Sequence, residues 1–298
     1  MKRLPAIALA AALLAGCGSR GGEAGGRTAD GAASRTASLT CIGSDTLVNL
    51  ALAWAEAWMS AHPEVRISVT GGGSGTGIAA LVAGTVDIAN ASREMSAEEI
   101  AAARGNGIEP IRHTVALDAI AVVVHPSNPV DRLTLAQVAD AYTGRIGRWS
   151  DLGGADRPIV LLSRESNSGT YIYFLEQVVR LGRKDAKDLF SPETLLMPSS
   201  EGISTEVRQN PNAIGDDGLG YVTTDQKPVA LARDAAAPFV LPSAATVIDG
   251  SYPVSRPLFM YTAGEPRGAA KEFLGFVRGE GQRLVAGLGF VPLQDGDR

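Results

Sequence analysis

Short apolar runs alternate along the chain with segments whose apolar residues recur at helical spacing. The run at 39–43 has the length and composition of a buried strand, and the segment 46–61 places its apolar side chains on one stripe of a helix. Further strands are expected at 65–70, 86–91, 159–162, 220–223, 229–232 and 258–262, and further helices at 77–83, 96–104, 133–142, 168–180 and in two segments within 267–287. This order is typical of an α/β protein with a largely parallel sheet and helices on its faces.

One apolar run, at 111–125, is longer than an ordinary strand. It has room for two strands, or for one strand that crosses between two lobes, and Pro126 and Pro129 end it. At about 100–200 residues per domain, a chain of 298 residues favours two domains or lobes. No repeat of about 20–50 residues is visible, so a solenoid or a propeller is not supported.

The start of the chain has the pattern of a lipoprotein export signal. Lys2 and Arg3 precede an apolar stretch interrupted only by Pro5, which leads into Leu-Ala-Gly-Cys with Cys17 at its end. The apolar stretch is too short for a membrane-spanning helix, which needs about 20 residues. We expect residues 1–16 to be a lipoprotein signal peptide and Cys17 to be acylated, with an ordinary secretory signal as the alternative.

From Cys17 to residue 37 the chain holds mainly Gly, Ala, Ser and Thr with scattered charges and no large apolar side chain. We expect a lipidated, flexible tether at 17–37. Loss of Lys2 and Arg3 with the signal would change the formal net charge from -5 to -7. Cys41, the other cysteine, lies in an apolar run and is expected to be a buried, unreactive thiol.

Composition narrows the range of functions. The chain has 27 Lys and Arg against 32 Asp and Glu and no basic cluster, which argues against nucleic-acid binding. The motifs G-x-S-x-G, S-x-x-K and H-E-x-x-H are absent from the sequence. His62, His113 and His125 are isolated and favour structural roles over zinc binding. We therefore expect a binding protein without catalytic residues, metal or cofactor.

A glycine-rich segment between a predicted strand and a predicted helix is the first candidate for chemistry. Five glycines together with Ser74 and Thr76 make up 71–77, where bare backbone amides and a helix N-terminus can hold an anion. The segment is neither a Walker A loop, because no Lys follows, nor a G-x-G-x-x-G motif, because Thr76 interrupts it. A glycine run taken alone is also compatible with a linker.

Two further turns repeat this layout. Ser44, Asp45 and Thr46 follow the strand at 39–43, where an ordinary helix-capping role is the alternative. In the other turn Arg164 precedes a Ser-Gly-Thr helix start that begins at Ser168. Arginine offers two parallel hydrogen bonds to an oxyanion, although a surface ion pair is the alternative. Because ligands of open α/β sheets bind beyond the carboxyl ends of the strands, three such turns indicate an oxyanion site.

With these motifs, the chain resembles the phosphate-binding component of high-affinity phosphate ABC importers over nearly all of 39–298. The matching segments are IGSDTL (42–47), TGGGSGTG (70–77), DIANASR (87–93), VVVHPSNP (122–129), YTGRIGRWSDLGG (142–154), SRESNSGT (163–170) and GLGYV (218–222). The resemblance implies a two-lobed periplasmic binding protein of type II, an α/β fold in which each lobe is a mostly parallel sheet flanked by helices, with the ligand cleft between the lobes. It further implies lobe 1 at 38–117 plus 256–298, lobe 2 at 118–255, and a hinge in two crossing strands near 116–124 and 254–260.

The resemblance also implies which residues bind phosphate. They are Ser44, Asp45, Thr46, Ser74 and Gly75 from one lobe and Arg164, Ser168, Gly169 and Thr170 from the other. Many members of the family carry a carboxylate after an Ala-Ser pair, where it accepts the proton of hydrogen phosphate and would repel sulfate. Here Arg93 follows that pair, and it is a further candidate ligand. Asp45 and Asp118 are the candidates for the acceptor, with a helix cap and an ordinary strand-edge acid as the alternatives.

The expected function follows from the resemblance. The protein would be a lipid-anchored, extracytoplasmic monomer that captures inorganic phosphate by lobe closure and delivers it to an ABC permease powered by a separate ATPase. One alternative is a receptor for another tetrahedral oxyanion, such as sulfate, molybdate or tungstate. Another is a sensing or adhesion lipoprotein that reuses the fold.

Overall fold

The computed structural model describes residues 37–294 and 296. The expected signal peptide at 1–16, the lipidation site Cys17 and all of the expected tether except Ala37 lie outside the described residues. Ala37 instead begins β1 (Ala37–Gly43), since its N–H donates to Glu64 O at 3.0 Å and it pairs in register with Val65. Among the described residues, no helix is both long and apolar enough to cross a membrane.

The order of elements alternates helices with strands, as the hydrophobic pattern predicts. The helices are α1 (Asp45–Ala61), α2 (Ser74–Val82), α3 (Ala97–Gly105), α4 (Leu135–Tyr142), α5 (Gly169–Phe174), α6 (Ser200–Gln209), α7 (Ala244–Ile248) and α8 (Gly268–Arg278). The strands after β1 are β2 (Val65–Thr70), β3 (Ile88–Ala91), β4 (Pro110–Val124), β5 (Arg132–Thr134), β6 (Val160–Arg164), β7 (Leu195–Met197), β8 (Ala213–Gly218), β9 (Lys227–Pro228), β10 (Ala230–Ala232) and β11 (Ser255–Ala263).

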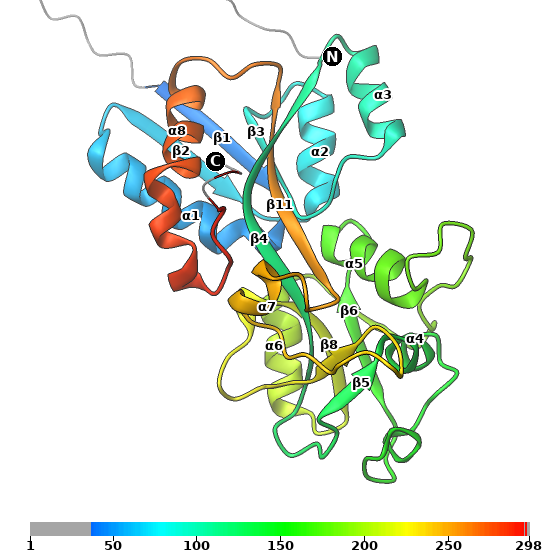
Figure 1. Cartoon of the computed structure of the whole chain (residues 1–298). Coiled ribbons are helices and arrows are strands. Elements are labelled where there is room, and N and C mark those ends of the chain that lie inside the picture. Colours follow the sequence, from blue (N-terminus) through cyan, green and yellow to red (C-terminus); the bar gives the residue numbers. More distant parts are fainter. Residues whose placement is uncertain (1–36, 295, 297–298) are drawn as a thin grey trace, which may run out of the picture. The chain divides into compact units, whose positions relative to one another are not determined.

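The main sheet has two halves that share one long strand. Its strand order is β2-β1-β3-β11-β4-β8-β6-β7, with β9 also paired to β4, while β10 and β5 form a separate pair. The first part of β4 pairs with β11 and its last part with β8 and β9, so the apolar run at 111–125 is one continuous strand. Figure 1 shows β4 and β11 side by side, leading from the half that holds β1 to the half that holds β6. Pairs within each half are parallel, whereas those made by β4 and β11 with their neighbours are antiparallel.

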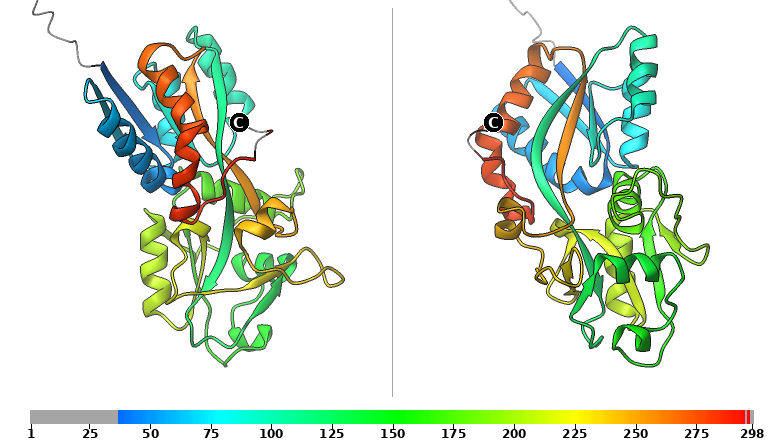
Figure 2. Two further views of the ribbon diagram at one scale, coloured as in Figure 1. Left: turned by 60° about the vertical axis from the view of Figure 1, so that its left-hand side comes forward. Right: turned by 45° about the vertical axis from the view of Figure 1, so that its right-hand side comes forward.

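Alternate side chains of the strands in the first half of the sheet point into two separate hydrophobic cores. Cys41, Ile88 and Met260 pack against α1 and α8, while Ala89 and Phe259 pack on the opposite face against α2 and α3. Figure 2 shows these helix pairs on the two sides of the strands. The Cys41 thiol is buried and free, as expected, and burial raises its pKa to about 12.

The second half is built in the same way. Val122 and Val124 of β4 belong to the core beneath α4 and α5, whereas Ala121 and Val123 point to the other face, against α6. The helix expected at 168–180 begins as α5 and continues as a π-helical turn over Leu175–Val179. The predicted division into 38–117 plus 256–298 and 118–255 stays a prediction, and β4 runs across its boundary.

One of the strand predictions is wrong. Residues Leu219–Tyr221 form a 3-10 turn in place of the strand expected at 220–223, and the strand in this region is β8, just before it. The chain leaves the sheet here because Leu219 N–H donates to Asp118 Oδ1 at 3.2 Å and the Tyr221 hydroxyl donates to Asp45 O at 2.8 Å. The sequence pattern also missed α6, α7, β5, β7, β8 and β9.

Candidate oxyanion-binding site

The three glycine- and serine-containing turns that the sequence singled out meet in the structure. Thr46 Oγ1 at the start of α1 lies 3.0 Å from Thr170 Oγ1 at the start of α5. The Gly75 N–H at the start of α2 donates to Asn167 O at 2.9 Å. Backbone N–H groups at helix starts lack intrahelical partners and carry partial positive charge, so this meeting point suits an anion.

Glycines allow the turns to approach one another. A Cβ on Gly77 would lie 2.3 Å from Ile42 O, so α2 can pack against the end of β1 only because this side chain is absent. A Cβ on Gly169 would lie 2.5 Å from both Ser74 Oγ and Ser92 Oγ. The glycine-rich segment is therefore part of a close backbone packing, and the linker interpretation does not apply to it.

The three predicted serines are all buried, and two of their hydroxyls have hydrogen-bond partners. Ser168 caps α5, with its side chain accepting from Thr170 N–H at 3.1 Å. Ser74 Oγ accepts from Ser92 N–H at 3.0 Å. Ser44 occupies the N-cap position of α1, yet its side chain makes no cap bond and its Oγ has no hydrogen-bond partner within the described part of the chain. Of the three, the Ser44 hydroxyl is the group that a bound anion would satisfy.

Arg164 ends β6 and is held on several sides. Its Nε and Nη2 donate to the carbonyl oxygens of Met197 at 3.3 Å and Pro198 at 2.9 Å. Its Nη1 donates to Ser200 Oγ and lies 3.1 Å from Asp45 Oδ2, which also accepts from Ser200 N–H at 2.9 Å. The Arg164 side chain is only 2% exposed, so the surface ion pair considered from the sequence does not describe it.

Arg256 also reaches the meeting point, and the sequence interpretation missed it. It lies in β11 directly opposite Asp118 of β4, and both side chains are buried. Its Nη2 donates to Asp118 Oδ2 at 3.0 Å and to Thr170 Oγ1 at 2.9 Å, and its Nη1 donates to Ser92 O at 3.0 Å. Burial raises the pKa of the Asp118 carboxyl, while Arg256 opposes this shift. The available signal was a charged residue within an otherwise apolar strand.

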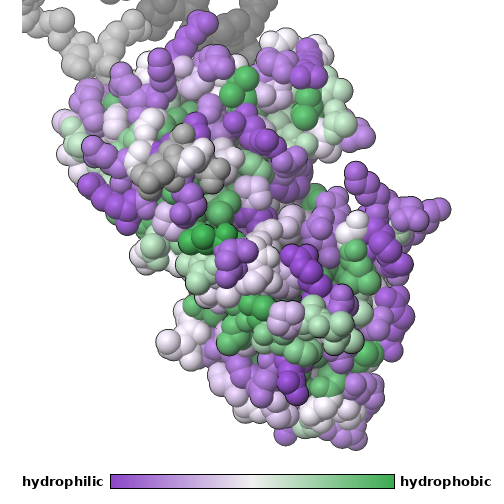
Figure 3. Space-filling view, in the orientation of Figure 1, coloured by the Kyte–Doolittle hydropathy of each residue, from purple (hydrophilic) through white to green (hydrophobic). Residues whose placement is uncertain are grey.

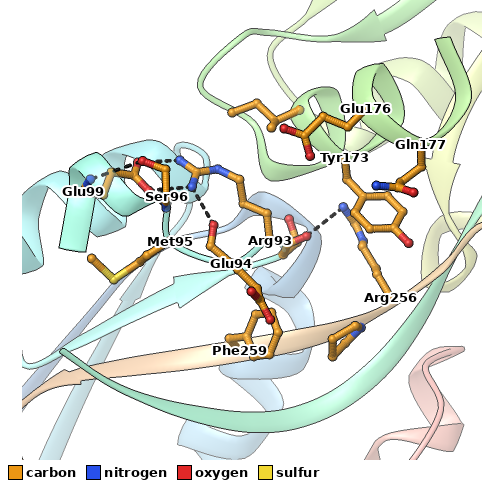
Figure 4. Close-up of a pocket in the computed structure, with 13 residues that line it drawn as sticks. Arg93, Glu94, Met95, Ser96, Glu99, Tyr173, Glu176, Gln177, Arg256 and Phe259 are labelled. Carbon is orange, nitrogen blue, oxygen red and sulfur yellow. Dashed lines mark hydrogen bonds and ion pairs between the residues drawn. The ribbon is translucent and has the colours of Figure 1, made fainter. Parts of the chain in front are cut away.

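Arg93, the further candidate ligand, is hydrogen-bonded to residues outside the three turns. Its guanidinium makes two 2.7 Å hydrogen bonds to Glu99 and points toward Ser96 (Figure 4). It lines a cavity of about 520 Å³ between residues 92–99, α5 and β11, which Arg256 also lines. Figure 3 shows the surface hollowed between the parts that hold α3 and α5. The structure thus brings together the predicted ligands of the three turns with Asp118, whereas the Arg93 guanidinium is bound to Glu99.

Each of the three histidines contacts a neighbouring side chain. His62 stacks on Trp58 with ring centroids 3.7 Å apart, and His113 Nε2 lies 2.9 Å from Thr262 Oγ1. His125 Nδ1 lies 2.8 Å from Ser127 Oγ. Among the residues that the structure describes, no group of three or more His, Cys, Asp or Glu side chains is placed to hold a metal ion.

Known proteins resemble this chain over most of its length. The sequence family described as a PBP superfamily domain matches residues 28–280. The chain is 35% identical over 273 residues to the phosphate-binding protein PstS of Pseudomonas aeruginosa, covering 86% of this chain and 83% of that protein. It is 33% identical over 288 residues to the PstS of Bacillus subtilis, covering 95% of this chain and 90% of that protein.

Solved structures give the same result. A putative phosphate ABC transporter substrate-binding protein from Clostridium perfringens, solved with bound phosphate, superposes with a TM-score of 0.76 at 32% identity, covering 86% of this chain and all of that one. An ABC-type phosphate transport receptor from Vibrio cholerae gives a TM-score of 0.68 at 28% identity, with 86% of this chain covered and 100% of that one. The chain therefore belongs to the PstS family of phosphate-binding proteins, in the PBP superfamily of ABC transporter substrate-binding proteins.

Proposed function

We propose that this protein binds inorganic phosphate outside the cytoplasm and delivers it to an ABC permease whose transport is powered by a separate ATPase. The observation that carries the proposal is the meeting of three helix-starting turns beside the buried Arg164. The names of its relatives point to the same ligand. No bond is broken in this function, and the relatives are named as binding proteins.

In the proposed complex the anion is held by the three turns and Arg164. The ligands are Ser44, Asp45, Thr46, Ser74, Gly75, Arg164, Ser168, Gly169 and Thr170. Hydroxyls and backbone N–H groups are neutral donors, and the guanidinium supplies the charge-assisted hydrogen bonds, which are the stronger class. Asp45 is the acceptor for the proton of hydrogen phosphate in this proposal. Ser200 N–H and Arg164 both engage its Oδ2, which leaves Oδ1 for the ligand, whereas both oxygens of Asp118 already accept, from Leu219 N–H and from Arg256.

Closure of two lobes would complete the site. Asp45 and Ser74 lie on one side of the predicted lobe division, and Arg164 and Thr170 on the other. An anion bound to both sides stabilises the closed state by its differential affinity for that state. The hinge in this proposal is the paired segment of β4 and β11, where small changes in backbone angles move whole lobes.

Membrane attachment is a separate part of the proposal. The lipobox ending at Cys17 supports acylation after cleavage of 1–16, which would leave the binding domain as a monomer tethered to the cell envelope. Expression of the full chain with a labelled fatty acid, followed by mass spectrometry, tests this step. Label on the wild type and none on a Cys17→Ser variant is expected, and label retained by the variant would contradict lipidation at this residue.

The ligand is tested by calorimetry on the mature chain after bound anion has been removed by partial unfolding and refolding. Phosphate, sulfate, molybdate and tungstate are titrated separately in a buffer free of oxyanions. Micromolar or tighter phosphate affinity with little response to sulfate is expected. A preference for another of these anions would favour the alternative oxyanion receptor, and no binding of any would favour the sensing or adhesion alternative.

A further inference from the structure

We propose that Arg256 is a positioning residue that polarises the hydroxyl pair of Thr46 and Thr170, so that the pair donates its one spare proton toward the bound anion. Arg256 did not stand out as a ligand in the sequence, and its proposed effect on the anion runs through other side chains. This inference rests on the proposed phosphate-binding function. It adds a second cation that acts from behind the hydroxyl pair.

The donor directions follow from the chemistry of the groups. A guanidinium has N–H donors and no acceptor, so Thr170 Oγ1, at 2.9 Å from Arg256 Nη2, must accept. The second Nη2 hydrogen serves Asp118 Oδ2 at 3.0 Å, and Thr46 Oγ1 lies farther away, at 3.5 Å. The Arg256 donor therefore fixes one lone pair of the Thr170 hydroxyl as an acceptor.

The two hydroxyls then have one proton to spare. Thr46 Oγ1 and Thr170 Oγ1 lie 3.0 Å apart, so one hydroxyl proton is used between them. Whichever hydroxyl donates, the proton of the other remains for a third acceptor, and both side chains are buried at the meeting point of the three turns. Hydrogen bonds in a chain polarise one another, so donation from a cation at one end strengthens donation to an anion at the other.

Arg256 is held firmly enough to give this direction. Asp118 lies opposite it in the β4–β11 pairing and accepts from Nε and Nη2. The guanidinium carbon lies 5.6 Å from the centre of the Tyr173 ring, whose hydroxyl donates to Ser255 O at 2.6 Å. Figure 4 shows the Tyr173 ring beside Arg256, which also donates to Ser92 O. These contacts fix the plane of the guanidinium, and so the donor that faces Thr170.

This arrangement gives the side of the site formed by Arg256, Thr46 and Thr170 a role in orienting the anion. A positive group behind the hydroxyls favours ligand oxygens that accept, and disfavours a P–OH group that would have to donate there. An unprotonated oxygen of phosphate is thus directed to the hydroxyl pair of Thr46 and Thr170, and the protonated oxygen to the Asp45 side. Arg256 would thereby set the orientation of the anion.

A double-mutant cycle tests the role. Arg256→Met alone would leave the Asp118 carboxylate buried without its partner. The cycle is therefore made in an Asp118→Asn background, in which an amide oxygen still accepts from Arg256 and no buried carboxylate remains when Arg256→Met is added. Phosphate affinity is measured for this background, with Arg256→Met, with Thr170→Val, and with both. We expect Arg256→Met to weaken binding at least about tenfold when Thr170 is present and less than about threefold when Thr170→Val has removed the hydroxyl. Equal losses in the two backgrounds would overturn the proposal.

Two controls keep the result interpretable. Arg132→Met removes an arginine that stacks on Phe239 at 5.4 Å, away from the three turns, and is expected to leave phosphate affinity unchanged. If the chain with both Asp118→Asn and Arg256→Met does not fold, the cycle is repeated with Arg256→Lys in the native background, where the positive charge is kept. Coupling between Arg256→Lys and Thr170→Val is again expected. Additive losses of phosphate affinity would overturn the role. A wild-type chain without phosphate affinity would contradict the proposed function itself, whereas additive losses in a phosphate-binding chain contradict only this role.

Discussion

Asp45 Oδ2 lies 3.1 Å from Arg164 Nη1 and joins the start of α1 to the end of β6. The same oxygen accepts from the N–H of Ser200 at the start of α6. Both partners of Asp45 lie beyond the predicted lobe boundary, so this carboxylate contributes to the proposed site and to the contact between its two sides. Removal of the charge on Asp45 or on Arg164 should therefore affect phosphate binding more than the stability of either half of the sheet.

Arg164→Ala should weaken phosphate binding by at least about 1.5–3 kcal/mol, the contribution of one hydrogen bond to a charged group. The side chain is 2% exposed, so solvent screens it little. Calorimetry measures the change. Arg148→Ala, which removes an exposed arginine paired with Asp156 at 2.7 Å, is the matched control and should leave affinity unchanged. Wild-type affinity in the Arg164 variant would remove this residue from the site.

Asp45→Asn should narrow the discrimination between phosphate and sulfate more than it weakens phosphate binding. The amide keeps the shape of the side chain but can donate to sulfate, which the carboxylate repels. The ratio of the two affinities is the measured quantity. Asp87→Asn is the control, because Asp87 Oδ2 accepts from Thr40 N–H at 2.8 Å in an exposed position. A ratio unchanged by Asp45→Asn would show that this carboxylate does not accept the ligand proton.

Gly169→Ala should weaken phosphate binding and leave the melting temperature of the free protein nearly unchanged, because Gly169 and the two serines that it contacts lie on opposite sides of the predicted lobe boundary and an open state would separate them. The new Cβ would lie 2.5 Å from Ser74 Oγ and Ser92 Oγ, and overpacking of this kind costs about 1–3 kcal/mol. Gly275→Ala in α8 has no atom within 4 Å of its new Cβ and serves as the control; it should stabilise the helix slightly and leave affinity unchanged. If both variants bind phosphate like the wild type, the close packing of the turns is not needed for binding.

Asn167→Ala should speed phosphate release and leave association nearly unchanged. The Asn167 side chain donates to Gly72 O at 2.9 Å, across the predicted lobe boundary, and a neutral hydrogen bond contributes about 0.5–1.5 kcal/mol. Stopped-flow kinetics separates the two rates. Asn106→Ala is the matched control, since Asn106 donates to Val82 O at 2.8 Å within one half of the sheet. An unchanged release rate would show that this contact does not stabilise the closed state.

Asp216 should make the protein less stable as the pH rises toward neutrality. Burial raises the pKa of this carboxyl to about 7, with hydrogen bonding and Arg164 opposing the shift, whereas an unfolded Asp titrates near about 4. Between these values the folded state keeps a proton that the unfolded chain has lost, so the free energy of unfolding falls as the pH rises through this window and levels off above it.

Asp216→Asn removes the titrating carboxyl. The free energy of unfolding of this variant should therefore fall less than that of the wild type between about pH 4 and pH 7. Urea denaturation across this range measures the difference. Asp249→Asn is the comparison variant, because hydrogen bonds from Ser251 lower the pKa of that exposed carboxyl and its removal should not flatten the fall. Parallel curves for Asp216→Asn and the wild type would contradict the assignment.

The turns of the site could be read from the sequence because their signals are local. A strand, a few small polar or glycine residues and a helix start lie within a short stretch at Ser44, at Ser74 and at Ser168, and backbone geometry makes each a source of free N–H groups. The long strand β4 and the helix α1 were likewise marked, the strand by a long apolar run and the helix by apolar side chains on one stripe. The oxyanion prediction needed no more than these patterns and the family resemblance.

What the sequence could not supply depends on pairing between distant segments. The strand β8 carries Asp216 and Asp217 and was missed, because its burial comes from lying between β4 and β6 and not from an apolar pattern. Arg256 looks like an isolated charge until the antiparallel register places it opposite Asp118 and against Thr170. Local sequence thus determined which turns can offer donors to an anion, and the tertiary structure decided which turns meet and which charges stand behind them, since cross-strand register and close packing are properties of the whole fold.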